Sequence, residues 1–109
     1  MAQLQFSVTN QIIAGTTPTI IYKFHTVSPA DITTAYLTAS DGKEILLEKT
    51  LSEAVVGEDS LSWTLTQQET LELPARIKMM CNWKKSDGTR GASEEMGVSV
   101  VKNHKEVVI

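Results

Sequence analysis

The sequence predicts an all-β fold, a two-sheet antiparallel Ig-like sandwich of about seven strands with one short helical turn, and three observations lead to it. Apolar side chains recur at every second position through most of the chain, which is the period of half-buried strands. Asp41-Gly42 and Asp87-Gly88 are strong hairpin signals, because both turn positions tolerate positive φ. The prolines fall between the periodic segments rather than inside them. A small closed barrel is the competing architecture.

The expected strands follow one another at short intervals, separated by turn-forming residues. In order, they cover residues 3–9, 19–25, 33–40, 43–50, 61–65, 77–83 and 92–102. Alternation along a strand places one face toward a core and the other toward solvent, as a sandwich requires. We therefore expect Trp63 to lie between the sheets with Leu61 and Leu65. Cys81 occupies the apolar row of its own strand and is expected to be a small buried hydrophobic residue.

The period of two breaks after residue 65, where a helical turn is predicted. Thr66-Gln67-Gln68-Glu69 fits a capping box, in which the threonine hydroxyl and the glutamate carboxylate each bond a backbone N–H at the helix start. Pro74 follows closely and limits the helix to little more than one turn. Leu71 and Leu73 are expected to close the edge of the core there.

Length and composition indicate one small domain over residues 1–102, followed by a tail over residues 103–109. The 109 residues are 41% hydrophobic, which is enough for a modest core. A single cysteine cannot form a disulfide within the chain. The sequence shows neither a signal-peptide pattern nor an apolar run of the ~18–20 residues that a membrane span needs. We therefore expect a protein made in the cytoplasm that does not bind membranes.

No residues with the pattern of a catalytic, cofactor or metal site stand out, and we expect no enzyme activity, cofactor or small-molecule substrate. His25 and His104 lie in no nucleophile motif. The acidic pairs Glu58-Asp59 and Glu94-Glu95 lack the spacing that binds calcium. The glycines are dispersed singly and form no phosphate-binding loop.

The basic residues concentrate around one predicted hairpin. Lys84, Lys85 and Arg90 flank its turn beside Trp83, and they are candidate partner contacts. Such a tip is most simply a soluble charged hairpin, but it would also fit an acidic patch on a neighbouring subunit. A nucleic-acid backbone is a third alternative. The net charge of −3 argues against nucleic acid.

The tail begins with polar residues and ends with Val107, Val108 and Ile109, which are also candidate partner contacts. An exposed apolar end risks aggregation in a lone monomer. The tail therefore folds back along its own sheet edge, or it binds a neighbouring subunit by adding a strand or inserting its apolar tip. A disordered tail is the third alternative.

The order of these signals resembles a known family. Leu65–Leu71 leads into the strand Ile77–Trp83, the hairpin Ser86–Thr89 and a strand ending at Val101, while Ala30-Asp31-Ile32 begins an earlier strand. This order is similar to small Ig-like virion domains of tailed phages of Gram-positive bacteria, especially the N-terminal domain of baseplate upper proteins. The resemblance covers roughly residues 16–101. The family tends to have a glycine before the strand after the helical turn, where this chain reads Leu73-Pro74-Ala75-Arg76.

That departure weakens the match to the baseplate protein itself. Because the sequence also stops where a baseplate protein would continue into further domains, we expect a stand-alone phage structural or accessory protein. The resemblance implies a non-enzymatic virion protein, made in the bacterial host cytoplasm, that contacts other virion proteins or copies of itself. The alternative is a carbohydrate- or host-surface-binding sandwich. Ligand-binding sandwiches usually display exposed aromatic residues, whereas most aromatic residues of this chain lie in apolar rows; these are Tyr22, Phe24, Trp63 and Trp83.

Overall fold

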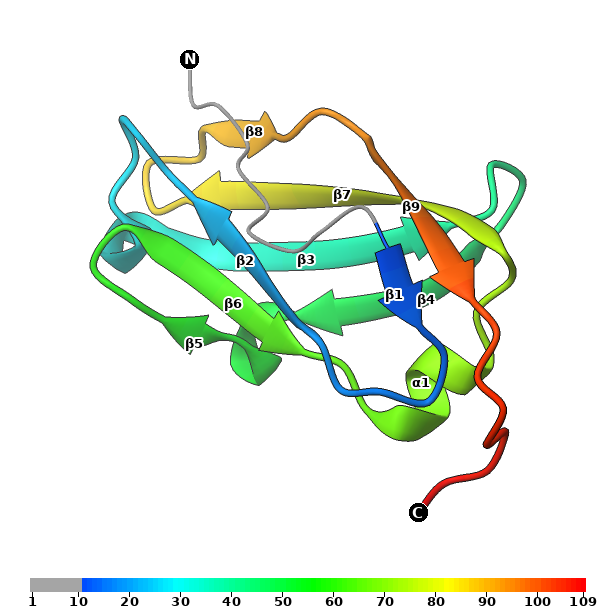
Figure 1. Cartoon of the computed structure of the whole chain (residues 1–109). Helices are drawn as coiled ribbons and strands as arrows, with labels where there is room; N and C mark the ends of the chain where they lie inside the picture. Colours follow the sequence, from blue (N-terminus) through cyan, green and yellow to red (C-terminus); the bar gives the residue numbers. More distant parts are fainter. Residues whose placement is uncertain (1–10) are drawn as a thin grey trace.

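The computed structural model describes residues 11–109 (Figure 1), and the strand expected over residues 3–9 lies outside the described residues. The strands are β1 (Gln11–Ile13), β2 (Thr19–Lys23), β3 (Ile32–Ser40), β4 (Ile45–Thr50), β5 (Val55–Val56), β6 (Ser60–Thr64), β7 (Arg76–Lys85), β8 (Arg90–Ala92) and β9 (Met96–Val101). The helix α1 (Gln67–Leu71) and two 3-10 turns, η1 (Pro29–Asp31) and η2 (Leu51–Glu53), complete the described part. The one short α-helix matches the prediction.

The strands form two sheets that pack face to face, so the sandwich is confirmed and the closed barrel is wrong (Figure 1). The larger sheet has the order β1-β9-β7-β3-β4, with β8 also paired to β7, and the smaller sheet has the order β2-β6-β5. The pairs are antiparallel except for β1 and β9, which are parallel. The expectation of purely antiparallel sheets is therefore wrong at this edge. After β1 the chain turns at Gly15 and enters β2 of the other sheet. Since β1 and β9 are not joined by a hairpin, the connection does not force them to be antiparallel.

Both predicted hairpins form, and their aspartates stabilise them. Gly42 and Gly88 have φ of +94° and +90°, the left-handed region that favours glycine. Asp41 Oδ1 accepts hydrogen bonds from the backbone N–H groups of Lys43 and Glu44 at 2.8 and 2.9 Å. These backbone bonds lower the pKa of Asp41 below its ordinary value.

The single strand expected over residues 92–102 is wrong, because the chain breaks into β8 and β9. Both strands pair with β7, β8 near its end and β9 near its start. The break is at Ser93, which is buried. Its Oγ accepts the Cys81 backbone N–H at 2.8 Å, and its own N–H donates to the Cys81 carbonyl at 2.8 Å. These two bonds hold the chain against β7 at the point where it changes direction.

The core lies between the sheets and contains the residues expected there. Trp63, Leu61 and Leu65 are at most 1% exposed, and Cys81 is fully buried. Tyr22, Phe24 and Trp83 form an aromatic cluster in which the Tyr22 and Phe24 ring centroids are 4.5 Å apart and those of Phe24 and Trp83 are 5.0 Å apart. The aromatic residues that the sequence placed in apolar rows are therefore core residues.

The capping box at α1 is present as predicted. The Glu69 backbone N–H donates to Thr66 Oγ1 at 3.1 Å, and Glu69 Oε1 accepts the Thr66 backbone N–H at 2.8 Å. Thr70 is fully buried and ties the helix to the β1–β2 connection. Its hydroxyl accepts the Gly15 N–H at 2.9 Å and donates to the Thr16 carbonyl at 2.8 Å. The connection and the helix therefore close this end of the sandwich together.

Candidate functional site

The outer face of the larger sheet carries a shallow groove of about 280 Å³. Its lining side chains come from β3, β4 and β7 and from the segment around β8; they include Tyr36, Thr38, Glu48, Lys78, Met80, Asn82, Arg90 and Glu95. The groove combines an aromatic ring, a thioether and charges of both signs. Such a mixed lining suits a polar partner surface or ligand better than a purely apolar one.

Tyr36 is the exposed aromatic residue of this groove, and our sequence interpretation missed it. Its side chain belongs to the polar row of β3, because Ala35 and Leu37 on either side of it are buried. Tyr36 is 37% exposed. The signal was present in the alternation of residues 33–40, which places Tyr36 opposite to the core. Its neighbour across the β3–β7 pair is Asn82.

The structure brings two of the three predicted basic contacts together on this face. Lys84 and Arg90 are paired across β7 and β8, and both line a smaller hollow of about 190 Å³ beside Tyr36. Arg90 Nη2 donates to Asn82 Oδ1 at 3.3 Å, which orients the guanidinium toward the groove. Lys85 follows Lys84 and faces the other way; its Nζ lies 3.8 Å from Asp87 Oδ2. Lys85 is therefore separated from the other two.

The predicted apolar contacts Val107, Val108 and Ile109 lie at the other end of the sandwich (Figure 1). Arg76 pairs with Ser99, so β9 ends beside the start of the ten-residue β7, while the basic hairpin follows its far end. At about 3.3 Å per residue, the two groups are separated by about 30 Å. The structure therefore places the candidate contacts in two separate regions.

The tail does not form a strand, so the interpretation that it folds back along its own sheet edge is wrong. The side-chain amide of Gln67 binds it instead: Gln67 Nε2 donates to the Ile109 carbonyl at 3.0 Å, and the Ile109 N–H donates to Gln67 Oε1 at 2.7 Å. The apolar side chains stay in solvent, with Val107, Val108 and Ile109 exposed by 55%, 52% and 86%. The Gln67 side chain therefore makes the two backbone hydrogen bonds of Ile109 that a neighbouring strand would have made.

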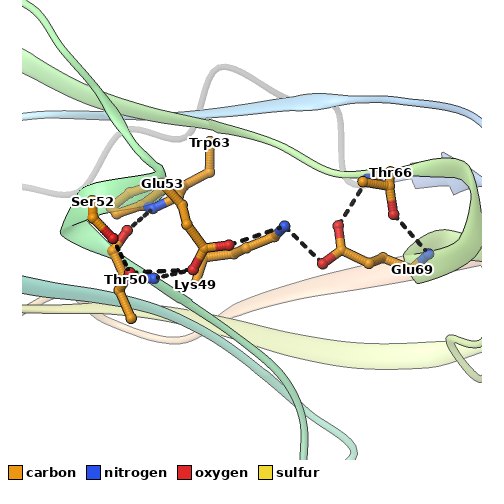
Figure 2. A network of polar contacts seen from close by, with 7 residues as sticks. All are labelled: Lys49, Thr50, Ser52, Glu53, Trp63, Thr66 and Glu69. Carbon is orange, nitrogen blue, oxygen red and sulfur yellow. Dashed lines mark hydrogen bonds and ion pairs between the residues drawn. The ribbon is translucent and has the colours of Figure 1, made fainter.

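A lysine at the edge of the core joins two glutamates from different elements (Figure 2). Lys49 is 8% exposed, and its Nζ lies 2.7 Å from Glu69 Oε2 and 3.6 Å from Glu53 Oε2. Glu53 Oε1 accepts the Thr50 backbone N–H at 3.0 Å, and Trp63 Nε1 donates to the Thr50 carbonyl at 2.9 Å. The network links β4, η2, β6 and α1. The carboxylates of Glu53 and Glu69 are both engaged in these ion pairs and hydrogen bonds, so the role of the network is structural.

The electrostatics of Glu69 agree with that role. Burial by itself raises the pKa of its carboxyl. The hydrogen bonds from Lys49 and the Thr66 backbone, together with the positive charge of Lys49, outweigh burial and lower the pKa below its ordinary value. The ionised form is therefore the one that the fold stabilises.

The remaining reactive groups are buried or isolated. Burial raises the pKa of the Cys81 thiol to about 12, which leaves it protonated and unreactive at neutral pH. His25 and His104 are exposed and far apart in the sequence. Within residues 11–109 no group of three or more histidine, cysteine, aspartate or glutamate side chains could hold a metal ion. No helix in the same part is long and apolar enough to cross a membrane.

Comparison with known proteins establishes the fold. A solved structure of the fibronectin(III)-like modules of Clostridium thermocellum CbhA aligns with a TM-score of 0.57 over 100% of both chains, at 16% sequence identity. The fold is a fibronectin type III-like, Ig-like β-sandwich. No family model and none of the curated proteins matches the sequence. At this identity the likeness concerns architecture, and the function has to be argued from the surfaces of the sandwich.

Proposed function

We propose that this chain is a non-enzymatic structural or accessory subunit of a phage or prophage virion. It acts through protein–protein contacts with other virion proteins or with copies of itself. It is made in the cytoplasm of the bacterial host and resides in the particle. Nucleic acid, membranes and small-molecule substrates are not its partners.

The observation that carries the proposal is the separation of two chemically different candidate contact surfaces. One is the polar groove with Tyr36, Lys84 and Arg90; the other is the apolar end at residues 107–109. A subunit inside a ring or lattice needs two patches so that it can contact two neighbours at once. The chain is about 46 Å long, and the two patches lie toward opposite ends of it. The virion assignment itself rests on the resemblance of the strand and turn order to phage Ig-like domains.

The direct test is association with particles. Cells that carry the gene are induced to produce phage, and the particles are treated with nuclease, banded in a density gradient and probed with an antibody against this chain. We expect the chain to band with the major capsid protein, while a soluble host enzyme stays at the top of the gradient. A chain that remains at the top with the host enzyme overturns the proposal.

A second candidate function is favoured by one observation, the exposure of Tyr36. Carbohydrate-binding sandwiches stack sugar rings on exposed aromatic residues and bind the hydroxyl groups with neighbouring polar side chains. Here Asn82, Arg90 and Glu48 line the same groove as Tyr36. A glycan array tests this function with the full chain and with Tyr36→Ala. Binding that Tyr36→Ala abolishes would favour it, and the absence of binding to every glycan would remove it.

A further inference from the structure

The α1 end of the sandwich contains an apolar hollow of about 410 Å³. Leu71 and Leu73 form one side of it, and Val100 and Val101 at the end of β9 form another. The polar residues Lys102, Asn103 and Glu106 also line it. A hollow with these walls exposes apolar surface to water, which is unfavourable. Covering that surface with another apolar group would therefore stabilise the protein.

The last three residues, 107–109, are apolar as well, but they do not line the hollow. Asn103 Nδ2 donates to the Ala14 carbonyl at 2.9 Å, and the Ile109 backbone exchanges two hydrogen bonds with the Gln67 side-chain amide. Between these fixed points, Glu106 lines the hollow, while Val107 and Val108 remain 55% and 52% exposed. An apolar hollow and an unburied apolar segment therefore lie side by side on one chain.

We propose that two copies of this chain pack end to end about a two-fold axis, with Val107 and Val108 of each copy in the hollow of the other. The inference rests on the proposed function, for which it names one partner and one surface. Because the hollow and residues 107–108 are neighbours on one chain, a single two-fold rotation places each segment against the hollow of the other copy. The resulting contact is symmetric and leaves no free hollow for a third copy. Neither copy has to release its bonds to Gln67.

The charges that line the hollow fit the same arrangement. Lys102 and Glu106 both line it, with Lys102 Nζ 3.5 Å from Glu106 Oε1 within one chain. Each copy therefore brings a pair of opposite charges to the contact, and neither charge of the pair lacks a partner there. The apolar walls and the charged residues together resemble the usual anatomy of protein interfaces.

Analytical ultracentrifugation of the full chain tests the proposal. We expect the wild type to sediment as a concentration-dependent dimer of the 12.0 kDa chain. Val108→Asp puts an unpaired charge into the partner's hollow and should raise the dissociation constant about tenfold or more. The matched control is Val55→Asp, because Val55 is 71% exposed on β5, away from this end. It should dimerise like the wild type.

Disulfide trapping then locates the segment. Ala75 is exposed and lines the hollow, so Ala75→Cys and Val108→Cys are made as two separate single variants. Native Cys81 is fully buried and does not interfere. When the two variants are mixed and oxidised, we expect a disulfide that joins position 75 of one chain to position 108 of another. In a chain carrying both substitutions, a disulfide within one monomer would show that the hollow receives its own segment and would overturn the proposal.

The failures of the two proposals are distinguishable. A wild type that is monomeric at every concentration, or a dimer that Val108→Asp leaves unchanged, overturns the end-to-end contact. The same chain can still band with particles, in which case the virion function stands. A dimer that responds to Val108→Asp supports the contact even when the chain is absent from particles.

Discussion

Substituting Gly91 by alanine tests how tightly the aromatic cluster is packed. Gly91 lies on β8 opposite Trp83 of β7. A Cβ atom at this position would lie 2.5 Å from Trp83 Cε2 and from Trp83 Cζ2, which is far inside van der Waals contact. The indole cannot simply move away, because it is 6% exposed and packs against Tyr22 and Phe24 with ring centroids 5.3 and 5.0 Å away.

Overpacking of this kind costs about 1–3 kcal/mol. The two contacts at 2.5 Å place this clash in the upper part of that range, about 2–3 kcal/mol, and alanine recovers about 0.4–1 kcal/mol by restricting the unfolded chain, so the net loss is about 1–2.6 kcal/mol. At about 4–8 °C per kcal/mol for a domain near this size, that corresponds to a decrease in Tm of roughly 4–20 °C. Gly97→Ala is the matched control: it substitutes another strand glycine, on β9, where a Cβ atom would meet nothing within 4 Å.

Thermal and urea denaturation followed by tryptophan fluorescence measure both variants. We expect Gly91→Ala to unfold earlier than the wild type and Gly97→Ala to be unchanged or slightly more stable. If Gly91→Ala were as stable as Gly97→Ala, Trp83 would not occupy the position described, and the account of the β7–β8 edge would be wrong.

Three further predictions concern the core and its edge. Glu69→Gln should cost about 1–3 kcal/mol at pH 7, because the buried Lys49 loses the nearer of its two carboxylate partners and keeps only Glu53. Since folding lowers the Glu69 pKa, this stabilisation is present above the ordinary pKa of 4.5 and is lost as the pH falls through the folded pKa, so the difference from wild type in urea titrations should shrink there. Trp63→Ala should cost about 3–5 kcal/mol, enough to unfold much of the protein, and an unchanged melting temperature would show that Trp63 is not in the core. Cys81 should react with a thiol reagent only after unfolding, and rapid labelling of the native chain would contradict its burial.

The elements that the sequence predicted well are those whose signals are local. Alternation places Trp63 and Cys81 in the core because a strand with one buried face shows its burial in its own residues. The two Asp-Gly turns are equally local. The strands β1 and β5 are three and two residues long, too short to show any period, and they were not predicted.

The features that were missed depend on contacts between distant residues. The break between β8 and β9 follows from the bonds of Ser93 to the Cys81 backbone, twelve positions away. The end of the tail is set by Gln67, 42 positions away. Tyr36 is different, since its place in the polar row was visible in the sequence. The candidate contacts were recognised by residue type, but only the structure shows that Lys84 and Arg90 share a face and Lys85 does not.

Cross-linking mass spectrometry on purified particles tests most directly that this chain works through contacts with other virion subunits. An amine-reactive reagent is applied to intact particles, and peptides that contain Lys84 are searched for links between chains. We predict that Lys84, which lines the hollow beside Tyr36, links to another virion protein or to a second copy. Particles that contain the chain but yield only links within one molecule, with Lys84 freely modified, would contradict the account of this surface.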